Sequence, residues 1–296
     1  MLKRFTEPEY RHPLDANALL LRVTQGCTWN RCHFCNVSRS YPFLYASYEE
    51  FEEELQAKVH HYPPATRVWL LGSNPLVLPT ERLLGYLAIV RRYLPHCQGI
   101  AMQSRVTDVR RKSLRELRQL REAGIQEVFL GIESGDDAVL KLLNKGADRA
   151  TALEQMQRLM QADIGIVPMY MLGCGGAGSW QRNAKLTADL LNRVSCRMIS
   201  TTGLTIFEDT PLWQMRDNGS FKEASEQEKI LEMLTFVEEL QGETFLYSFH
   251  YLNPVHFAVH LPEEKAKICS GLRRFLEENS AEEIEEMVGR KFMRSL

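Results

Sequence analysis

The 296-residue sequence has few cysteines and lacks any long apolar run. No stretch approaches the roughly 20 apolar residues that a membrane-spanning helix needs. The first fifteen residues, MLKRFTEPEYRHPLD, carry charges and prolines where a secretory signal needs an apolar core. We therefore expect a cytoplasmic protein without a membrane partner.

The sequence also lacks a large excess of charge of either sign. Its net charge of -2 gives no bulk attraction to nucleic acid or to an anionic membrane. The segment from Arg105 to Arg121 is rich in arginine, which could indicate an RNA-binding helix. However, Glu116 interrupts the positive charge and no aromatic cluster accompanies it. A solvent-exposed helix is the better interpretation, and we expect no nucleic-acid partner.

Apolar, strand-like runs alternate with helical patterns through the first two thirds of the chain. This alternation predicts parallel strands with helical crossovers and a sheet that is buried on both faces. About six such units fit before Phe207, fewer than the eight that close a full barrel. We predict the α/β class, with a partial (β/α)6 barrel over residues 15–207 and a mainly helical C-terminal extension over residues 208–296. The strand-like runs are 18–23, 67–72, 99–104, 127–135, 164–173 and 196–207.

Local signals mark the ends of several helices. Ser47 opens one helix with a capping box, and prolines 63 and 64 end it. Thr107 is the expected N-cap of a single helix that reaches Gly124. Further helices are expected over 223–240 and 262–278, followed by an acidic, solvent-exposed helical tail.

Three of the seven cysteines lie close together, directly after the first strand-like run. In GCTWNRCHFC, Cys27, Cys32 and Cys35 have the spacing C-x4-C-x2-C. Three thiolates leave one metal position open, whereas a structural zinc normally takes four protein ligands. His33 is a poor fourth ligand because adjacent residues rarely reach one metal together. Soft thiolates favour an iron–sulfur cluster in which one iron lacks a protein ligand. A zinc-ribbon fragment or three incidental thiols are the alternatives.

The position of this loop also favours a binding site. In parallel α/β folds, ligands bind at the carboxyl ends of the strands. Because the loop follows the first strand, we expect it at that edge of the sheet. The remaining cysteines stand singly, and we expect them to be buried as small hydrophobic side chains. They are Cys97, Cys174, Cys196 and Cys269.

From about residue 19 to residue 207 the sequence resembles the radical S-adenosylmethionine (SAM) superfamily. Four residues separate Cys27 from Cys32, and in this the loop resembles those of a subgroup that departs from the commoner C-x3-C-x2-C spacing. Its overall organisation resembles coproporphyrinogen-oxidase-like radical SAM proteins. The resemblance implies that Cys27, Cys32 and Cys35 bind a [4Fe–4S] cluster whose open iron chelates SAM. It also implies that Phe34 lies near the adenine.

The resemblance implies further SAM contacts after the second, third and fourth strands. Gly72 would let the backbone approach the ligand closely, although a simple turn is the alternative. Arg105 would pair with the SAM carboxylate, with a surface arginine as the alternative. Glu133 would accept hydrogen bonds from the ribose hydroxyls, with a helix-capping acid as the alternative. The full set of expected SAM contacts is Phe34, Gly72, Ser73, Asn74, Ser104, Arg105, Glu133 and Ser134.

The resemblance implies an enzyme that reductively cleaves SAM to a 5′-deoxyadenosyl radical, which abstracts hydrogen from an unidentified substrate. That substrate would be a small molecule or a peptide, and the electron donor would be a protein such as flavodoxin or ferredoxin. A non-catalytic haem- or cofactor-binding carrier that keeps the cluster and the SAM site is the alternative function. Candidates for a C-terminal cover over the substrate are His250, Tyr251, Asn253 and His256.

Overall fold

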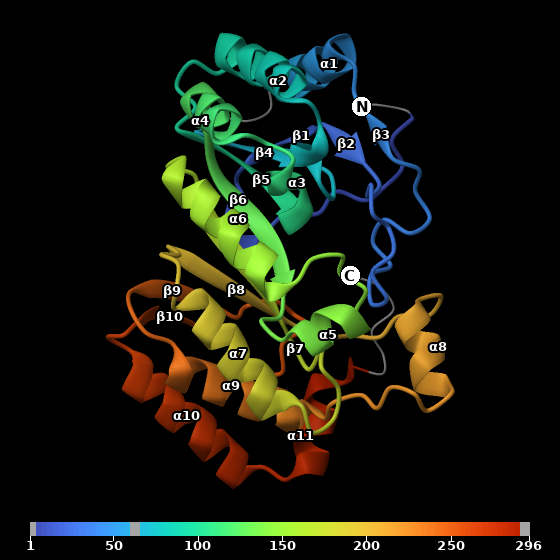
Figure 1. Ribbon diagram of the computed structural model, residues 1–296, viewed down its shortest axis with the longest axis vertical. Helices are drawn as coiled ribbons and strands as arrows, with labels where there is room; N and C mark the ends of the chain where they lie inside the picture. The colour runs from blue at the N-terminus through green and yellow to red at the C-terminus, as the bar shows by residue number, and fades with distance from the viewer. Residues whose placement is uncertain (1–3, 60–65, 291–296) are drawn as a thin grey trace. The chain divides into compact units, whose positions relative to one another are not determined.

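The computed structural model describes residues 4–59 and 66–290 (Figure 1). These residues have an α/β fold with a mostly parallel sheet of eight strands, in the order β1-β4-β5-β6-β7-β8-β9-β10. The predicted fold class is therefore confirmed. A separate ribbon pairs β2 (Thr24–Gln25) with β3 (Leu44–Tyr45). The strands of the large sheet are β1 (Leu19–Arg22), β4 (Arg67–Leu71), β5 (Gly99–Arg105), β6 (Ile125–Glu133), β7 (Gly165–Leu172), β8 (Met198–Gly203), β9 (Thr244–Tyr247) and β10 (Ala258–Leu261).

The chain divides into two compact units. Unit 1 comprises Met1–Asn30, Val37–Gly131 and Glu154–Ile166. Unit 2 comprises Arg31–Asn36, Ile132–Leu153 and Val167–Leu296. The expected division into residues 15–207 and 208–296 stays a prediction. In the part of the chain that the structure describes, no helix is long and apolar enough to cross a bilayer.

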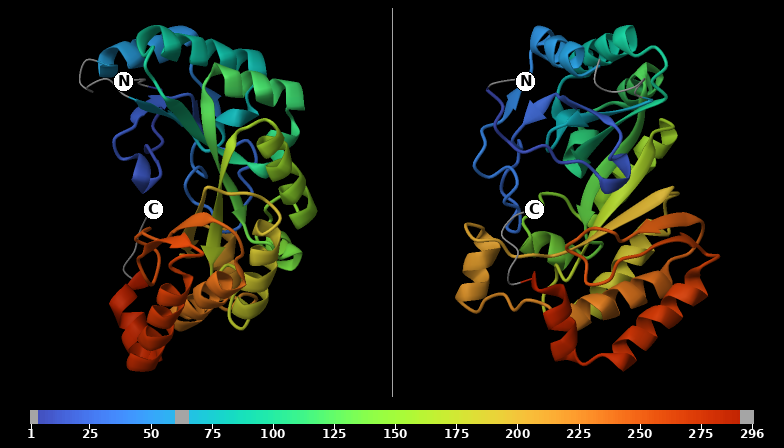
Figure 2. Two further views of the ribbon diagram at one scale, coloured as in Figure 1. Left: turned by 90° about the vertical axis from the view of Figure 1, so that its left-hand side faces the viewer. Right: turned by 180° about the vertical axis from the view of Figure 1, so that it is seen from behind.

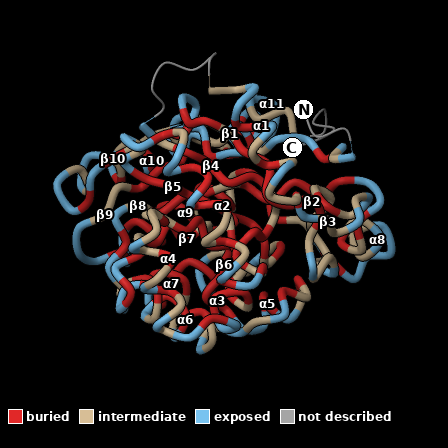
Figure 3. Tube along the Cα trace, turned by 90° about the horizontal axis from the view of Figure 1, so that it is seen from above, coloured by how far each residue is buried: buried red, intermediate tan, exposed pale blue. Residues whose placement is uncertain are grey.

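Unit 1 contains β1, β4, β5 and most of β6. β1 pairs in parallel with β4, and β4 pairs in parallel with β5. Residues 68–71 of β4 are all buried, as a parallel strand covered on both faces requires (Figure 3). Helix α1 (Tyr48–Val59) packs beside α2 (Thr80–Tyr93), and α2 packs beside α4 (Leu114–Ala123) (Figures 1 and 2).

The capping box that opens α1 forms as predicted. The Glu50 N–H donates to Ser47 Oγ at 3.2 Å, and the Ser47 N–H donates to the Glu50 carboxylate at 2.7 Å. The helix end expected at prolines 63 and 64 lies outside the described residues.

The single helix expected from Thr107 to Gly124 is wrong, because two helices occupy this segment. Helix α3 (Val106–Arg110) ends early, and α4 begins after Ser113. The Ser113 hydroxyl accepts from the Glu116 N–H at 3.2 Å, and Glu116 accepts from the Ser113 N–H at 2.7 Å. This capping box starts a new helix within the basic stretch. Gly124 ends α4 with φ 124°, as predicted.

Unit 2 contains β8, β9, β10 and most of β7. β8 pairs in parallel with β7 and β9, whereas β10 is antiparallel to β9. Helix α9 (Glu226–Glu239) packs against α7, α10 and α11 (Figure 1), and its residues 232–237 are all buried. β9 and β10 were not predicted, since only helices were expected after Phe207.

The remaining helices of the two units are α5 (Asp137–Leu142), α6 (Arg149–Gln161), α7 (Trp180–Leu191), α8 (Pro211–Asp217), α9 (Glu226–Glu239), α10 (Lys265–Glu278) and α11 (Ala281–Val288).

The acidic tail forms α11, and it is not solvated on all sides. Ser280 caps this helix by accepting from the Glu283 N–H. Ile284 is 1% exposed and buries one face of α11, which packs against α9. The expectation of a helix is confirmed, and only its outer face is acidic and exposed.

Candidate functional site

The cysteine loop follows β2, and the chain passes from unit 1 to unit 2 within it. Cys27 belongs to unit 1, whereas Cys32 and Cys35 belong to unit 2. All three thiols are partly exposed, and no disulfide joins cysteines within the described residues. In residues 4–59 and 66–290, no group of three or more His, Cys, Asp or Glu side chains is placed to hold a metal ion. The donor chemistry of the loop, three soft thiols in one short segment, nevertheless fits an iron–sulfur cluster.

The other four cysteines differ from those of the loop. Cys174, Cys196 and Cys269 are buried as predicted, whereas Cys97 is partly exposed. Burial raises the pKa of all four thiols, and it raises that of Cys196 to about 12. A thiol with a raised pKa stays protonated at neutral pH and is a poor metal ligand.

Buried polar side chains of unit 1 anchor the Cys27 end of the loop. Before Cys27, the Gly26 N–H donates to Glu7 Oε2 at 2.9 Å. After it, Asn74 Oδ1 accepts from the Thr28 N–H at 3.4 Å, and Asn74 Nδ2 donates to Thr28 Oγ1 at 2.8 Å. The backbone on both sides of Cys27 is therefore fixed by residues distant in sequence.

Ser73 and Asn74, two expected SAM contacts, have partners inside unit 1. Ser73 Oγ lies 3.4 Å from Glu7 Oε1 and makes a short hydrogen bond with Ser38 Oγ. Asn74 is fully buried and also donates to Asp108 Oδ2 at 3.2 Å. These bonds give both residues a role in shaping the loop, and their contact with SAM stays a prediction.

Gly72 makes a close approach to the protein's own backbone. Its φ of 131° is unfavourable for any residue with a side chain. A Cβ atom at this position would lie 1.9 Å from Thr24 Oγ1 and 2.7 Å from the Thr24 carbonyl oxygen. This contact at the end of β4 directly supports the structural alternative, a turn that only glycine fits.

Ser104 and Arg105 end β5. Ser104 is buried, and its hydroxyl donates to the Arg105 carbonyl at 3.0 Å. The Arg105 guanidinium lies 5.1 Å from the centroid of a Trp29 ring, within the cysteine loop. Arg105 thus contacts the loop, unlike the exposed arginines at positions 110, 111, 115 and 118 that follow it.

The second part of the cysteine loop docks on the segment around the end of α5. The His33 N–H donates to the Leu143 carbonyl at 2.9 Å, and His33 Nδ1 lies 2.7 Å from the Leu142 carbonyl oxygen. The His33 carbonyl accepts from the Leu212 N–H at 2.9 Å. The backbone between Cys32 and Cys35 is therefore held from two sides.

Phe34 and Glu133 lie near one another, with Lys145 between them. Lys145 Nζ donates to Glu133 Oε1 at 2.6 Å, and their side chains are only 8% and 10% exposed. The same ammonium lies 5.9 Å from the centroid of the Phe34 ring, which packs on an apolar cluster that includes Leu143. The sequence reasoning missed Lys145, although it lies in the same GIESGDDAVLKLLNKG stretch as Glu133.

Glu133 does not cap the following helix. Its φ of 62° is uncommon for a residue other than glycine. The N-cap of α5 is Asp136, whose carboxylate accepts from the Ala138 N–H at 2.9 Å. The helix-capping alternative for Glu133 is therefore wrong.

Ser134, the last expected SAM contact, is fully buried and belongs to a hydrogen-bonded chain. Its hydroxyl donates to Asn183 Oδ1 at 2.5 Å. Asn183 Nδ2 in turn donates to Glu232 Oε1 at 2.6 Å. Sequence reasoning missed Asn183 and Glu232, which lie on α7 and α9.

The candidates for a C-terminal cover lie in the loop between β9 and β10. Because β9 runs parallel to β8, this loop begins at the carboxyl ends of both strands. Asn253 Nδ2 donates to the Thr201 carbonyl at 2.9 Å, and burial lowers the pKa of His250 to about 4. Tyr251 and His256 are exposed. The loop is thus fixed to β8, and its part in covering a substrate stays a prediction.

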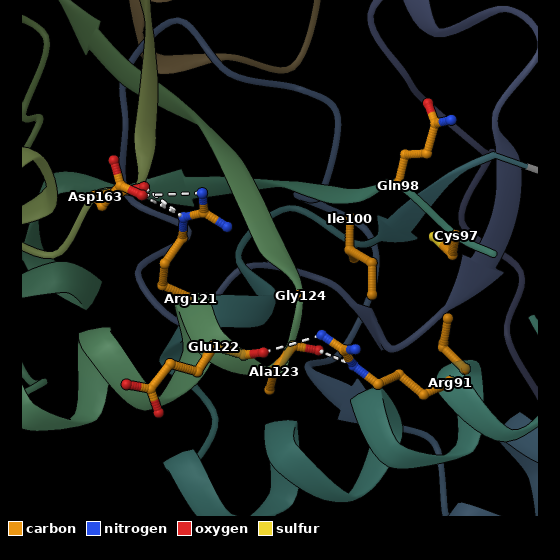
Figure 4. Close-up of a pocket in the computed structure, with 10 residues that line it drawn as sticks. Arg91, Cys97, Gln98, Ile100, Arg121, Glu122, Ala123, Gly124 and Asp163 are labelled. Atoms are coloured by element: carbon orange, nitrogen blue, oxygen red, sulfur yellow. Dashed lines mark hydrogen bonds and ion pairs between the residues drawn. The ribbon is translucent and has the colours of Figure 1, made fainter. Parts of the chain in front are cut away.

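A cavity of about 330 Å³ in unit 1 is lined by none of the expected cluster or SAM residues (Figure 4). It is at the amino-terminal ends of β5 and β6, whereas the cysteine loop follows a carboxyl end. Arg91 donates to the last carbonyls of α4, and Arg121 pairs with Asp163 at 2.9 Å (Figure 4). Both arginines therefore serve to stabilise the fold.

Residues 21–176, more than half of the chain, match the family model described as the radical SAM superfamily. The chain therefore belongs to the radical SAM superfamily, a class of enzymes whose cofactors are a [4Fe–4S] cluster and SAM. Over 176 residues it is 23% identical to anaerobilin synthase of Escherichia coli O157:H7, a match that covers 57% of this chain and 38% of that protein.

Two solved structures show the same fold. Methylornithine synthase (PylB) has a TM-score of 0.54 and 18% identity, covering 75% of this chain and 63% of its own. Coproporphyrinogen III oxidase (HemN) from Escherichia coli has a TM-score of 0.55 and 15% identity, covering 75% of this chain and 52% of its own. The chain thus spans less than two thirds of the length of each of these three relatives.

Proposed function

We propose that this protein binds a [4Fe–4S] cluster through Cys27, Cys32 and Cys35 and catalyses a radical reaction. When bound, the cluster and SAM supply a 5′-deoxyadenosyl radical that abstracts hydrogen from a substrate. The observation that carries this proposal is the C-x4-C-x2-C loop, which lies within the residues matched to the radical SAM superfamily. Three protein thiolates for four irons leave the open position that SAM needs.

The protein's own residues contact both parts of this loop. Glu7 and Asn74 accept hydrogen bonds from the backbone on either side of Cys27 and fix it there. The docking of His33 fixes the backbone between the other two cysteines. A ligand loop that is already ordered loses less conformational entropy when it binds its cofactor. We therefore assign Glu7, Asn74 and His33 to positioning of the cysteines.

We assign Glu133 and Phe34 to the nucleoside part of SAM. Lys145 occupies Oε1 of the Glu133 carboxylate, and we assign Oε2 to the ribose hydroxyls. The conformation of Glu133, with a positive φ, supports this assignment because strained backbone often persists where a functional side chain must be aimed. The expected contacts of Gly72, Ser73, Asn74, Ser104, Arg105 and Ser134 with SAM belong to the same proposal.

The remaining parts of the proposal come from the sequence. The core would be residues 15–207 and the extension residues 208–296. The substrate would be a small molecule or a peptide, and a protein such as flavodoxin or ferredoxin would supply the electron. We place the protein in the cytoplasm, where a reducing environment keeps thiols available for a cluster. The comparisons give no support to the carrier alternative.

Anaerobic reconstitution with iron and sulfide tests this proposal. We expect about four irons and four sulfides per chain, and 5′-deoxyadenosine after SAM and dithionite are added. Alanine at Cys27, Cys32 or Cys35 should abolish iron binding. Cys97→Ala is the matched control because Cys97 is also partly exposed, and it should keep the cluster. A zinc-loaded protein that takes up no iron would contradict the proposal.

A further inference from the structure

Helix α9 places a buried carboxyl group, Glu232, beneath two turns of unit 2. Glu232 is fully buried and lies beyond residues 21–176, the part of the chain matched by the family model. Three donors point at its two oxygens. Oε1 accepts from the Tyr170 hydroxyl at 2.5 Å and from Asn183 Nδ2 at 2.6 Å, and Oε2 accepts from the Gly173 N–H at 2.9 Å.

The first turn begins at Gly173, immediately after β7. Its glycine-rich sequence, GCGGAG, has positive φ at Gly173, Gly176 and Gly178. Glycine adopts positive and negative φ values about equally readily, so this segment has little intrinsic preference for one backbone conformation. The bond from the Gly173 N–H to Glu232 fixes the start of this turn. Bonds from the Ala177 N–H to the Lys222 carbonyl at 2.8 Å and from the Gly178 N–H to Glu228 at 2.6 Å hold its far end.

The second turn follows β6 and contains Glu133 and Ser134. Asn183, held by Glu232, accepts from the Ser134 hydroxyl, and Ser134 Oγ accepts from the Asp136 N–H at 2.9 Å. The two turns also meet directly, since the Cys174 thiol lies 3.7 Å from the Glu133 carbonyl oxygen. One carboxyl group thus holds both turns in a single hydrogen-bonded network.

We propose that Glu232 is a positioning residue for SAM, which sets the placement of the Glu133 turn and the Gly173 turn together. This inference rests on the proposed function, in which Glu133 and Ser134 contact the cofactor. Glu232 itself is fully buried and does not touch the ligand. The C-terminal extension therefore takes part in cofactor binding through its packing against the back of these turns.

The hydrogen-bond pattern fits a carboxyl group, because its two oxygens accept all three bonds while Asn183 keeps its orientation toward Ser134. In a glutamine, an oxygen placed toward Tyr170 and Asn183 would direct the NH2 group at the Gly173 N–H. The reverse orientation would direct the NH2 group at Asn183 Nδ2. With Asn183 oriented as in the structure, two donors face one another either way, and one of the two turns loses its support. A neutral glutamic acid keeps all three bonds, because its proton can be donated to the Tyr170 oxygen.

The experiment compares Glu232→Gln with Val237→Ala. Val237 is equally buried on the same helix, so its truncation lowers stability without removing a hydrogen bond from either turn. After reconstitution, we expect Glu232→Gln to keep its iron and to bind SAM about tenfold or more weakly, as loss of a buried hydrogen bond implies. Val237→Ala should bind SAM as the wild type does. Equal SAM affinity in wild type and Glu232→Gln, or equal weakening in both variants, would overturn the inference.

Amide hydrogen exchange of the cofactor-free protein gives a second readout. Glu232→Gln should speed exchange at residues 173–176 or at 134–136, and Val237→Ala should not do so selectively. If Glu232→Gln does not fold, Asn183→Ala removes the branch to Ser134 and the 3.5 Å contact with Cys174 Sγ but leaves the bond from the Gly173 N–H to Glu232. It should speed exchange at 134–136 and leave the Gly173 amide protected. Unchanged exchange in that variant would refute the network. Wild-type protein that fails to bind SAM would refute the proposed function, whereas the exchange pattern tests Glu232 independently.

Discussion

Replacement of Gly72 by alanine separates the two roles that this residue could have. An added Cβ would lie 2.7 Å from the Thr24 carbonyl oxygen, closer than real Cβ atoms come, and 1.9 Å from Thr24 Oγ1. Strain from φ 131° costs about 1–3 kcal/mol, and overpacking costs about 1–3 kcal/mol. The lower entropy of unfolded alanine returns about 0.4–1 kcal/mol. We therefore expect a net loss of about 1–6 kcal/mol, a large part of a typical domain's stability.

Urea unfolding of the cofactor-free protein, followed by circular dichroism, measures this loss. Thr24→Ala supplies the partner for a double-mutant cycle, because Thr24 Oγ1 is buried with no hydrogen-bond partner among the described residues. Its removal relieves the 1.9 Å contact and leaves the carbonyl contact and the strained φ in place. The double variant should therefore recover only part of the loss. Wild-type stability in Gly72→Ala, with weakened SAM binding alone, would show that the glycine serves the ligand.

Two further predictions concern buried acids. Glu133→Gln should weaken SAM binding by about 1.5–3 kcal/mol and leave the iron content unchanged, and titration of SAM into the reconstituted variant measures this. Wild-type affinity would mean that Glu133 serves only Lys145. Burial raises the pKa of Glu232 from 4.5 to about 7, so the folded state holds this proton more tightly than the unfolded state does. The contribution of Glu232 to stability is therefore greatest below pH 4.5 and is lost as pH rises to 7, and Glu232→Gln should remove this part of the pH dependence measured by urea unfolding.

Much of the fold could be predicted because each parallel strand carries its own signal. A strand buried on both faces, such as β4, is a continuous apolar run. A capping box such as that of Ser47 and Glu50 marks the start of a helix, here α1. β9 and β10 were missed because each has only four residues and lies between helical patterns. The break between α3 and α4 was missed although Ser113 and Glu116 carry the capping-box signature, since the surrounding arginines continue a helical pattern.

The candidate site, too, could be predicted from the sequence only in part. The three loop cysteines could be found because their function depends on spacing within one segment. Lys145 could not be paired with Glu133 from the sequence, because a lysine near a helix end is usually solvent-exposed. The role of Glu232 was even harder to predict, because the sequence around an acidic helical residue does not show which distant donors will bond to it. Such pairings are set by packing between elements, and spacing along the chain does not encode them.

The hydrogen-bonded network of Ser134, Asn183, Glu232 and Tyr170 also limits which substitutions this sequence can accept over evolutionary time. Asn183 Nδ2 and the Gly173 N–H both need an acceptor at position 232, so a substitution that removes the acceptor leaves a buried donor unpaired. Single substitutions within the network are therefore costly, and neutral change requires two or more positions to change in concert. These four residues come from four separate segments of unit 2, and among related sequences they should vary as a set.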